Sequence, residues 1–204
     1  MFCASPYTVR YTDSKMTFTM RNLPHWQPEH AALFLTWRLA GSLPPGVVAS
    51  KRVLDNPSTE GPGHQFVRMD LALDSVQSGP RWLKSPRIAS CVERAIVRGD
   101  AELKQYHLIA YVIMPNHVHI LIEPMVNAIR IMRGIKGVSA HAANQILHRS
   151  AGSFWQDESY DHWVRSESEF LKIQSYIELN PVRAGLTLRA QDWRWSSAWF
   201  HPDS

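Results

Sequence analysis

Three stretches of the chain are apolar and short, as β-strands are. Residues 31–39 (AALFLTWRL) form the first and end at the glycine- and proline-rich turn 41–46. Residues 105–114 (QYHLIAYVIM) form the second, and residues 117–123 (HVHILIE) form the third. A tight Pro-Asn turn separates the last two stretches, and this spacing predicts a β-hairpin.

Two further stretches carry the start and stop signals of helices. A Ser-Pro pair opens the helix predicted over residues 85–97, because proline is favoured at the first helical position. The helix predicted over residues 166–180 begins with a capping box made by Ser166 and Glu169. We expect Pro181 to end it, since proline removes a backbone donor.

The region between these helices is less regular. Residues 125–149 have a helical pattern, and we expect two helical pieces because Gly134 and Gly137 weaken the centre. Residues 150–165 are aromatic and polar without a clear period, so we expect irregular structure there. Strands and helices are mixed without strict alternation, which favours an α+β fold with an antiparallel sheet.

The chain has 204 residues, of which 45% are hydrophobic and 20% charged, so it is long enough for one globular domain and is not a disordered chain. We expect an N-terminal arm over residues 1–24, a single domain over 25–200 and a tail over 201–204. With two cysteines, a disulfide framework is excluded. The N-terminus resembles no signal peptide and no apolar run could span a bilayer, so we expect a cytoplasmic protein without a membrane partner.

The most specific chemical feature is the pair His117 and His119. In a strand, residues two apart point to the same face, so both imidazoles project together. We expect this face to lie away from the core, because the alternate positions are all apolar: Val118, Ile120 and Ile122. Two imidazoles can hold a divalent metal ion, although two histidines without a metal remain the alternative.

The capped helix offers further candidates. Lys172, Tyr176 and Asn180 are spaced four residues apart and form one stripe, beside an apolar stripe of Phe170, Ile173 and Ile177. Asn180 has an amide oxygen that could bind a metal ion, and Tyr176 has a phenol. Tyr176 could equally be a boundary aromatic residue whose hydroxyl lies in water.

Basic charge is concentrated in residues 125–150, which contain no acidic residue. The basic side chains there include Arg130, Arg133 and Lys136. Together with the net charge of +4, they indicate a surface for a phosphate backbone, with a solvated helix face as the alternative.

Several motifs together resemble one known family. They are YVIMPNHVHILIE (111–123), FWQDESYDHWV (154–164) and YIELNPVRAGL (176–186), supported by WRLAGSLP (37–44) and DWRWSS (192–197). This combination resembles the REP-associated tyrosine transposases, which are relatives of the single-tyrosine insertion-sequence transposases in the HUH superfamily. The resemblance runs from about residue 22 to residue 198, nearly the whole chain.

The resemblance implies a ferredoxin-like α+β fold of the HUH endonuclease type, an antiparallel sheet flanked by helices. His117 and His119 would be the two histidines of the HUH strand, Asn180 the third ligand of Mg²⁺ or Mn²⁺, and Tyr176 the nucleophile. Insertion-sequence relatives commonly have glutamine at the position of Asn180. Tyr160 is the rival nucleophile, but it has no amide four residues later.

The implied function is a metal-dependent, DNA strand-transferring transposase. It would cut and rejoin single-stranded or hairpin DNA at palindromic repeats through a 5′-phosphotyrosine, acting as a monomer or a homodimer. Arg130, Arg133 and Lys136 would bind the DNA backbone, and Lys172 would assist Tyr176 or bind phosphate. The alternatives are a domesticated hairpin-binding protein without transposition, a relaxase- or replication-initiator-like nickase, and a two-histidine hydrolase that uses Glu123.

Overall fold

The structure is a computed structural model that describes residues 17–21, 23–27, 31–43 and 79–199. The helices and strands, in chain order, are β1 (Thr17–Arg21), β2 (Leu23–Gln27), β3 (Leu33–Arg38), η1 (Trp82–Lys84), α4 (Pro86–Ala101), β4 (Tyr106–Ile113), β5 (His117–Pro124), α5 (Ala128–Ile146), β6 (Tyr160–Trp163), α6 (Glu167–Arg183) and η2 (Ala190–Asp192).

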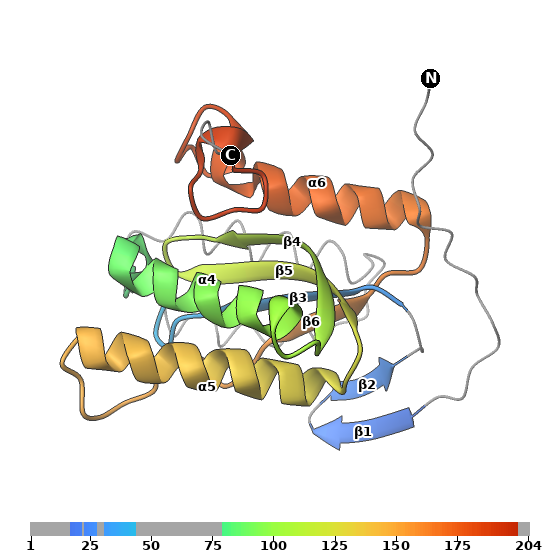
Figure 1. The fold of residues 1–204 in the computed structure, drawn as a ribbon, viewed down its shortest axis with the longest axis horizontal. Helices are drawn as coiled ribbons and strands as arrows, with labels where there is room; N and C mark the ends of the chain where they lie inside the picture. The colour runs from blue at the N-terminus through green and yellow to red at the C-terminus, as the bar shows by residue number, and fades with distance from the viewer. Residues whose placement is uncertain (1–16, 22, 28–30, 44–78, 200–204) are drawn as a thin grey trace.

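Four strands form one antiparallel sheet in the order β4-β5-β3-β6 (Figure 1). The elements β3-α4-β4-β5-α5-β6 follow one another as βαββαβ, which is the ferredoxin-like arrangement. The predicted α+β fold and the predicted hairpin of β4 and β5 are therefore confirmed. The hairpin places β5 beside β3 in the centre of the sheet, so the two histidines lie on a central strand.

Both faces of the sheet are covered. Helices α4 and α5 pack together on one face, and α6 lies across the other (Figure 1). The first face holds the larger core, which includes the β5 residues Val118, Ile120 and Ile122. The second core, between the sheet and α6, includes Leu121 and Ile177. Each such buried side chain contributes roughly 1.5–3 kcal/mol to folding. The second core therefore stabilises the packing of α6 on the sheet, although it is smaller than the first.

Helix α4 begins at Pro86, as the Ser-Pro pair predicts, and runs on to Ala101. Near its end, Gly99 allows a close approach to Tyr106 on β4. A Cβ atom at position 99 would overlap the Tyr106 ring. The Tyr106 hydroxyl donates a hydrogen bond to the carbonyl of Ile96, so the helix end and β4 are fastened together.

Helix α5 is continuous, and the expectation of two pieces is wrong. Gly134 and Gly137 lie within it, each costing about 1 kcal/mol relative to alanine. The buried stripe of Ile131, Ile135 and Ala143 packs against the core along the whole helix and offsets that cost.

Helix α6 also extends beyond its expected end. Ser166 caps its first turn as predicted, but Pro181 lies inside the helix, which continues to Arg183. Proline is tolerated here because it falls in the last turn, where the N–H of Ala184 still donates to the carbonyl of Asn180.

The stretch expected to be irregular contains β6, which pairs with β3 at the edge of the sheet. Part of the expected N-terminal arm is also ordered as strands, because β1 pairs with β2. Residues 1–16 of the arm and the tail 201–204 lie outside the described residues.

Candidate active site

His117 and His119 project from β5 towards α6. Their ring centres are 4.8 Å apart, as expected for residues two apart on a strand. Both side chains are completely buried. They point away from the larger core that includes Val118, Ile120 and Ile122, as expected, but they are buried because a second core covers this face as well.

Each imidazole is held through its Nδ1 atom. The Nδ1 of His117 lies 2.7 Å from the Oδ1 of Asn116, and the Nδ1 of His119 lies 2.7 Å from the Oγ1 of Thr36. An amide oxygen only accepts hydrogen bonds, so His117 donates from Nδ1 and carries its lone pair on Nε2. In known metal sites, a histidine that binds the metal through one ring nitrogen is oriented by a hydrogen bond at the other, as here.

Helix α6 brings Asn180 and Tyr176 to the histidines. Asn180 is buried, and its Nδ2 lies 3.4 Å from the Nε2 of His119. The half-buried ring of Tyr176, one turn earlier, has its centre 5.9 Å from that of the His119 ring. The structure therefore brings together the four residues that the sequence nominated as two separate pairs.

The start of α6 is fixed to the sheet by a polar cluster. Ser166 accepts a hydrogen bond from the N–H of Glu169, and the Glu169 carboxylate accepts one from the N–H of Arg165. The same carboxylate lies 2.9 Å from the Nε2 of His162 on β6. Partial burial alone would raise the pKa of Glu169, but these hydrogen bonds hold it below its usual value.

Phe34 on β3 packs beneath the site. Its ring centre lies 5.8 Å from that of His119, 6.4 Å from Tyr176 and 6.3 Å from Tyr160. Tyr160, the rival nucleophile, is thus close to the site, in the strand position opposite Thr36. Burial, with Asp161 and Glu169 nearby, raises the pKa of Tyr160 to about 12, which disfavours its ionised form.

Sequence reasoning missed Arg183. Its guanidinium carbon lies 4.9 Å from the centre of the Tyr176 ring, a cation–π contact. Arg183 is seven residues after Tyr176 and therefore on the same side of α6. The seven-residue spacing is visible in the sequence, but a helix that ended at Pro181 would not have included Arg183.

Lys136 is used inside the protein. Its ammonium donates to the carbonyls of Gln156 at 2.6 Å and Asp157 at 3.0 Å. Burial lowers the pKa of Lys136, which the nearby Asp157 partly counteracts. This lysine fastens α5 to the segment before β6, so its ammonium is engaged by backbone carbonyls and not by DNA in our proposal.

Three other basic candidates are exposed. Arg130 and Arg133 lie on α5, across the sheet from the histidines, so the structure does not bring them to the site. Lys172 lies on α6, one turn before Tyr176.

Glu123, the carboxylate of the hydrolase alternative, is also on β5 but at its other end, where it pairs with His107. It does not join the histidine pair. Among the residues that the structure describes, no three His, Cys, Asp or Glu side chains gather to hold a metal ion.

The donor set at the site nevertheless fits a divalent cation. The Nδ1 atom of each imidazole contacts Asn116 or Thr36, and the Nε2 of His119 lies beside the Asn180 amide. Turning the Asn180 amide by half a rotation would exchange Nδ2 for Oδ1 beside His119. Two imidazole nitrogens and an amide oxygen are ligands that Mn²⁺ and Mg²⁺ accept when water or substrate oxygens complete the shell.

Known proteins that are similar to this chain are transposases. Residues 88–180, which include the histidine pair, Tyr176 and Asn180, match the family described as "Transposase IS200 like". Over this segment the chain is similar to the IS200-like transposases. A Haemophilus influenzae protein named as a REP-associated tyrosine transposase is 29% identical over 122 residues, which cover 54% of this chain and 68% of that protein.

The fold of the chain also has a solved counterpart. The structure of a REP-associated tyrosine transposase bound to a REP hairpin covers 87% of this chain and 82% of its own, at 16% identity and a TM-score of 0.53. The predicted resemblance to this family is therefore confirmed. Within the described residues, none of the helices is both long and apolar enough to cross a membrane.

Proposed function

We propose that the protein cuts and rejoins single-stranded DNA at hairpin sites, with Tyr176 as the nucleophile. The observation that carries this proposal is the convergence of Tyr176 and Asn180, on one helix, with the buried histidine pair on β5. Strand β5 and helix α6 thus hold the Tyr176 phenol at a fixed position relative to the imidazole nitrogens and the Asn180 amide. The family match and the hairpin-bound structural relative support DNA as the substrate.

His117, His119 and Asn180 would hold Mg²⁺ or Mn²⁺. When bound, such an ion polarises a phosphodiester and offsets the charge that develops on it. Thr36 and Asn116 contribute indirectly, because their contacts to Nδ1 fix the orientation of each imidazole, and the Asn116 contact also sets the tautomer of His117.

In the cleavage step, the Oη atom of Tyr176 forms a bond to phosphorus and releases its proton to water. The bond from phosphorus to the 3′ oxygen breaks, and that oxygen takes up a proton to become a free 3′-hydroxyl. The product is a 5′-phosphotyrosine. Attack by a 3′-hydroxyl on this linkage reverses the step and rejoins DNA without an external energy source.

Arg183 stays next to the reacting tyrosine. Its cation–π contact holds the Tyr176 ring, and its positive charge favours negative charge on the phenol oxygen and on a nearby phosphate. All of these groups come from one chain, which supports cleavage by a monomer. We propose that Arg130 and Arg133 add contacts to the DNA backbone farther away and that Lys172 contacts phosphate near Tyr176.

The decisive experiment compares Tyr176→Phe with Tyr160→Phe. Each variant is incubated with a labelled single strand that carries a hairpin, in the presence of Mn²⁺, and run on a denaturing gel. We expect a covalent adduct with the unmodified protein and with Tyr160→Phe, and none with Tyr176→Phe. Mass spectrometry of the linked peptide identifies the residue directly.

Other outcomes would contradict the proposal in different ways. An adduct that persists in Tyr176→Phe and disappears in Tyr160→Phe would make Tyr160 the nucleophile. Hairpin binding without an adduct in the unmodified protein would favour a domesticated hairpin-binding protein.

A further inference from the structure

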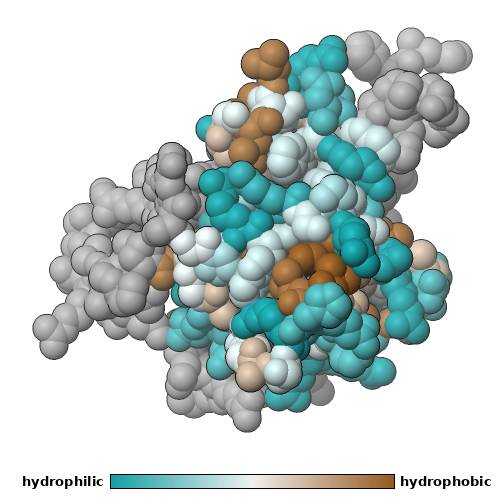
Figure 2. Space-filling model, turned by 90° about the vertical axis from the view of Figure 1, so that its left-hand side faces the viewer, coloured by the Kyte–Doolittle hydropathy of each residue, from teal (hydrophilic) through white to brown (hydrophobic). Residues whose placement is uncertain are grey.

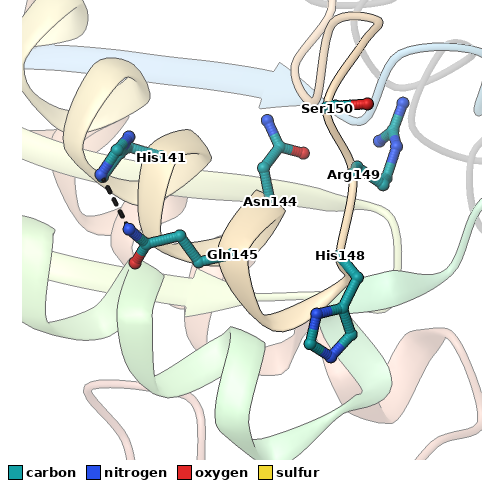
Figure 3. Close-up of a pocket in the computed structure, with 6 residues that line it drawn as sticks. All are labelled: His141, Asn144, Gln145, His148, Arg149 and Ser150. Atoms are coloured by element: carbon teal, nitrogen blue, oxygen red, sulfur yellow. Dashed lines mark hydrogen bonds between the residues drawn. The ribbon is translucent and has the colours of Figure 1, made fainter.

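A pocket lies at the end of α5, on the opposite face of the sheet from Tyr176. Its volume is about 510 Å³, within the range of ligand sites. The lining residues come from the last turns of the helix and the loop after it: His141, Asn144, Gln145, His148, Arg149 and Ser150 (Figure 3). None of them is acidic, and three can carry positive charge.

Arg149 is held in place rather than free in solvent. Its guanidinium carbon lies 4.3 Å from the centre of the Trp82 ring, and Trp82 stacks on the buried Phe154. Gly152 leaves room for it, because a Cβ there would lie 3.0 Å from the Nη2 of Arg149. A long side chain fixed in this way loses less entropy when it binds a ligand.

Two polar atoms of the pocket have no hydrogen-bond partner among the residues that the structure describes. The Nη1 of Arg149 and the Oδ1 of Asn144 are buried, and neither makes a hydrogen bond in the structure described. Buried polar atoms are nearly always satisfied, so a water molecule or a ligand group would satisfy this pair. Figure 3 shows Asn144, Arg149 and Ser150 on one side of the helix end, and the hydrogen bond between His141 and Gln145 beside them.

The backbone at this helix end is unusual for a residue with a side chain, as it also is at Lys104 after α4. His148 has a φ of 52°, in the left-handed region that helices usually reserve for glycine or asparagine after their last turn. Such a conformation is costly for a residue with a side chain. An imidazole is therefore kept at a position that glycine would occupy more easily.

The pocket and the candidate active site lie at the same end of the sheet. The loop after the pocket leads to Phe154, whose carbonyl accepts a hydrogen bond from Ala40, and to Gln156, whose N–H donates to Arg38. Arg38 stands opposite His117 across the β3–β5 pair. This end of the molecule, seen in Figure 2, is mostly hydrophilic with an apolar patch below its centre.

We propose that this pocket binds a phosphate group of the single strand that flanks the cleaved bond. The inference rests on the proposed function for the identity of the ligand. Such a strand would pass from Tyr176 around the end of β3 to the other face of the sheet, where Arg149 and Asn144 supply a charged donor and an amide. Arginine matches phosphate geometry with two parallel donors.

The first test does not depend on cleavage. Proton NMR of the His141 and His148 rings is recorded in the full chain while a 5′-phosphorylated thymidine trinucleotide or inorganic phosphate is added. We expect the trinucleotide to shift both signals, and inorganic phosphate at equal concentration to shift them much less. Arg149→Gln and Asn144→Asp should both abolish the shifts, and Asn144→Asp leaves the packing on Trp82 unchanged.

The second test measures DNA affinity by fluorescence anisotropy for hairpins with single-stranded flanks of increasing length. The unmodified protein should gain affinity once the flank reaches the pocket. Arg149→Gln should lose about tenfold on long flanks, the loss expected for one charge-assisted hydrogen bond, and nothing on short ones. Arg98→Gln, an exposed arginine on α4, is the matched control and should bind both like the unmodified protein.

The results separate this inference from the proposed function. No ring shifts, equal shifts with inorganic phosphate, or unchanged flank dependence in Arg149→Gln would each overturn the pocket assignment. A normal flank effect without any covalent adduct would instead leave the pocket standing and refute the nuclease.

Discussion

The guanidinium of Arg183 lies over the ring of Tyr176, 4.9 Å from its centre, two turns further along the same helix. Because Arg183 itself is exposed, this contact can be altered with little disturbance of the core.

We expect Arg183→Gln to slow adduct formation by about two- to fivefold from loss of the cation–π contact alone, and by more if the guanidinium also contacts phosphate. Single-turnover kinetics with saturating hairpin DNA would measure this rate, and Arg183→Lys should retain part of it. A rate equal to that of the unmodified protein in Arg183→Gln would remove this residue from the site.

His117 and His119 should matter for both chemistry and stability. Replacing either with glutamine should abolish adduct formation. His119→Ala should in addition lower the free energy of unfolding by about 1–3 kcal/mol, because it leaves the buried Thr36 hydroxyl without its partner. The exposed His107 is the control: His107→Gln should leave adduct formation and urea unfolding unchanged. Metal-dependent cleavage by a double His117/His119 variant would refute the metal-site proposal.

The hydrogen bonds of the Glu169 carboxylate with the backbone N–H of Arg165 and with His162 predict a pH dependence of stability. The pKa of Glu169 is lowered in the folded protein, so its contribution is fully present above the unfolded-state value of about 4.3 and is lost as the pH falls through the lower folded value. Glu169→Gln should therefore be less stable than the unmodified protein at pH 6, with a smaller difference at pH 3.5. Urea unfolding at both pH values measures this, with Glu167→Gln in the same turn as the control. A difference that grows towards low pH would contradict it.

Two helical glycines should respond in opposite ways to alanine. Gly137 on α5 has open space where a Cβ would go, so Gly137→Ala should raise the free energy of unfolding by about 0.5–1 kcal/mol. Gly99→Ala should lower it by about 1–3 kcal/mol, because the added methyl group would overlap Tyr106. Thermal unfolding of both variants tests the pair, and a stabilised Gly99→Ala would show that Tyr106 can move aside.

The sequence predicted those parts of the fold that are specified by local signals. The Pro-Asn turn gave the hairpin of β4 and β5, and the capping box with Ser166 gave the start of α6. Strand β6 escaped prediction because its four residues have no alternating pattern and it exists through pairing with β3. The continuity of α5 depends likewise on a buried stripe whose partners lie elsewhere in the chain.

The sequence predicted each of the two residue pairs of the candidate site, but not that the pairs meet. Spacing alone put His117 beside His119, and Tyr176 one turn from Asn180, but the meeting of the two pairs depends on how α6 lies across the sheet. The burial of the histidines has the same origin. Thr36 and Phe34 act on the site through strand register, for which one sequence holds no local signal.

Helix α6 carries the phenol, the amide and the guanidinium together, while the histidines stay on the sheet. A small tilt or slide of this one helix would therefore withdraw all three groups from the imidazoles at once. The proposed cleavage therefore depends on α6 being docked on the sheet as well as on the chemistry of each reactive group.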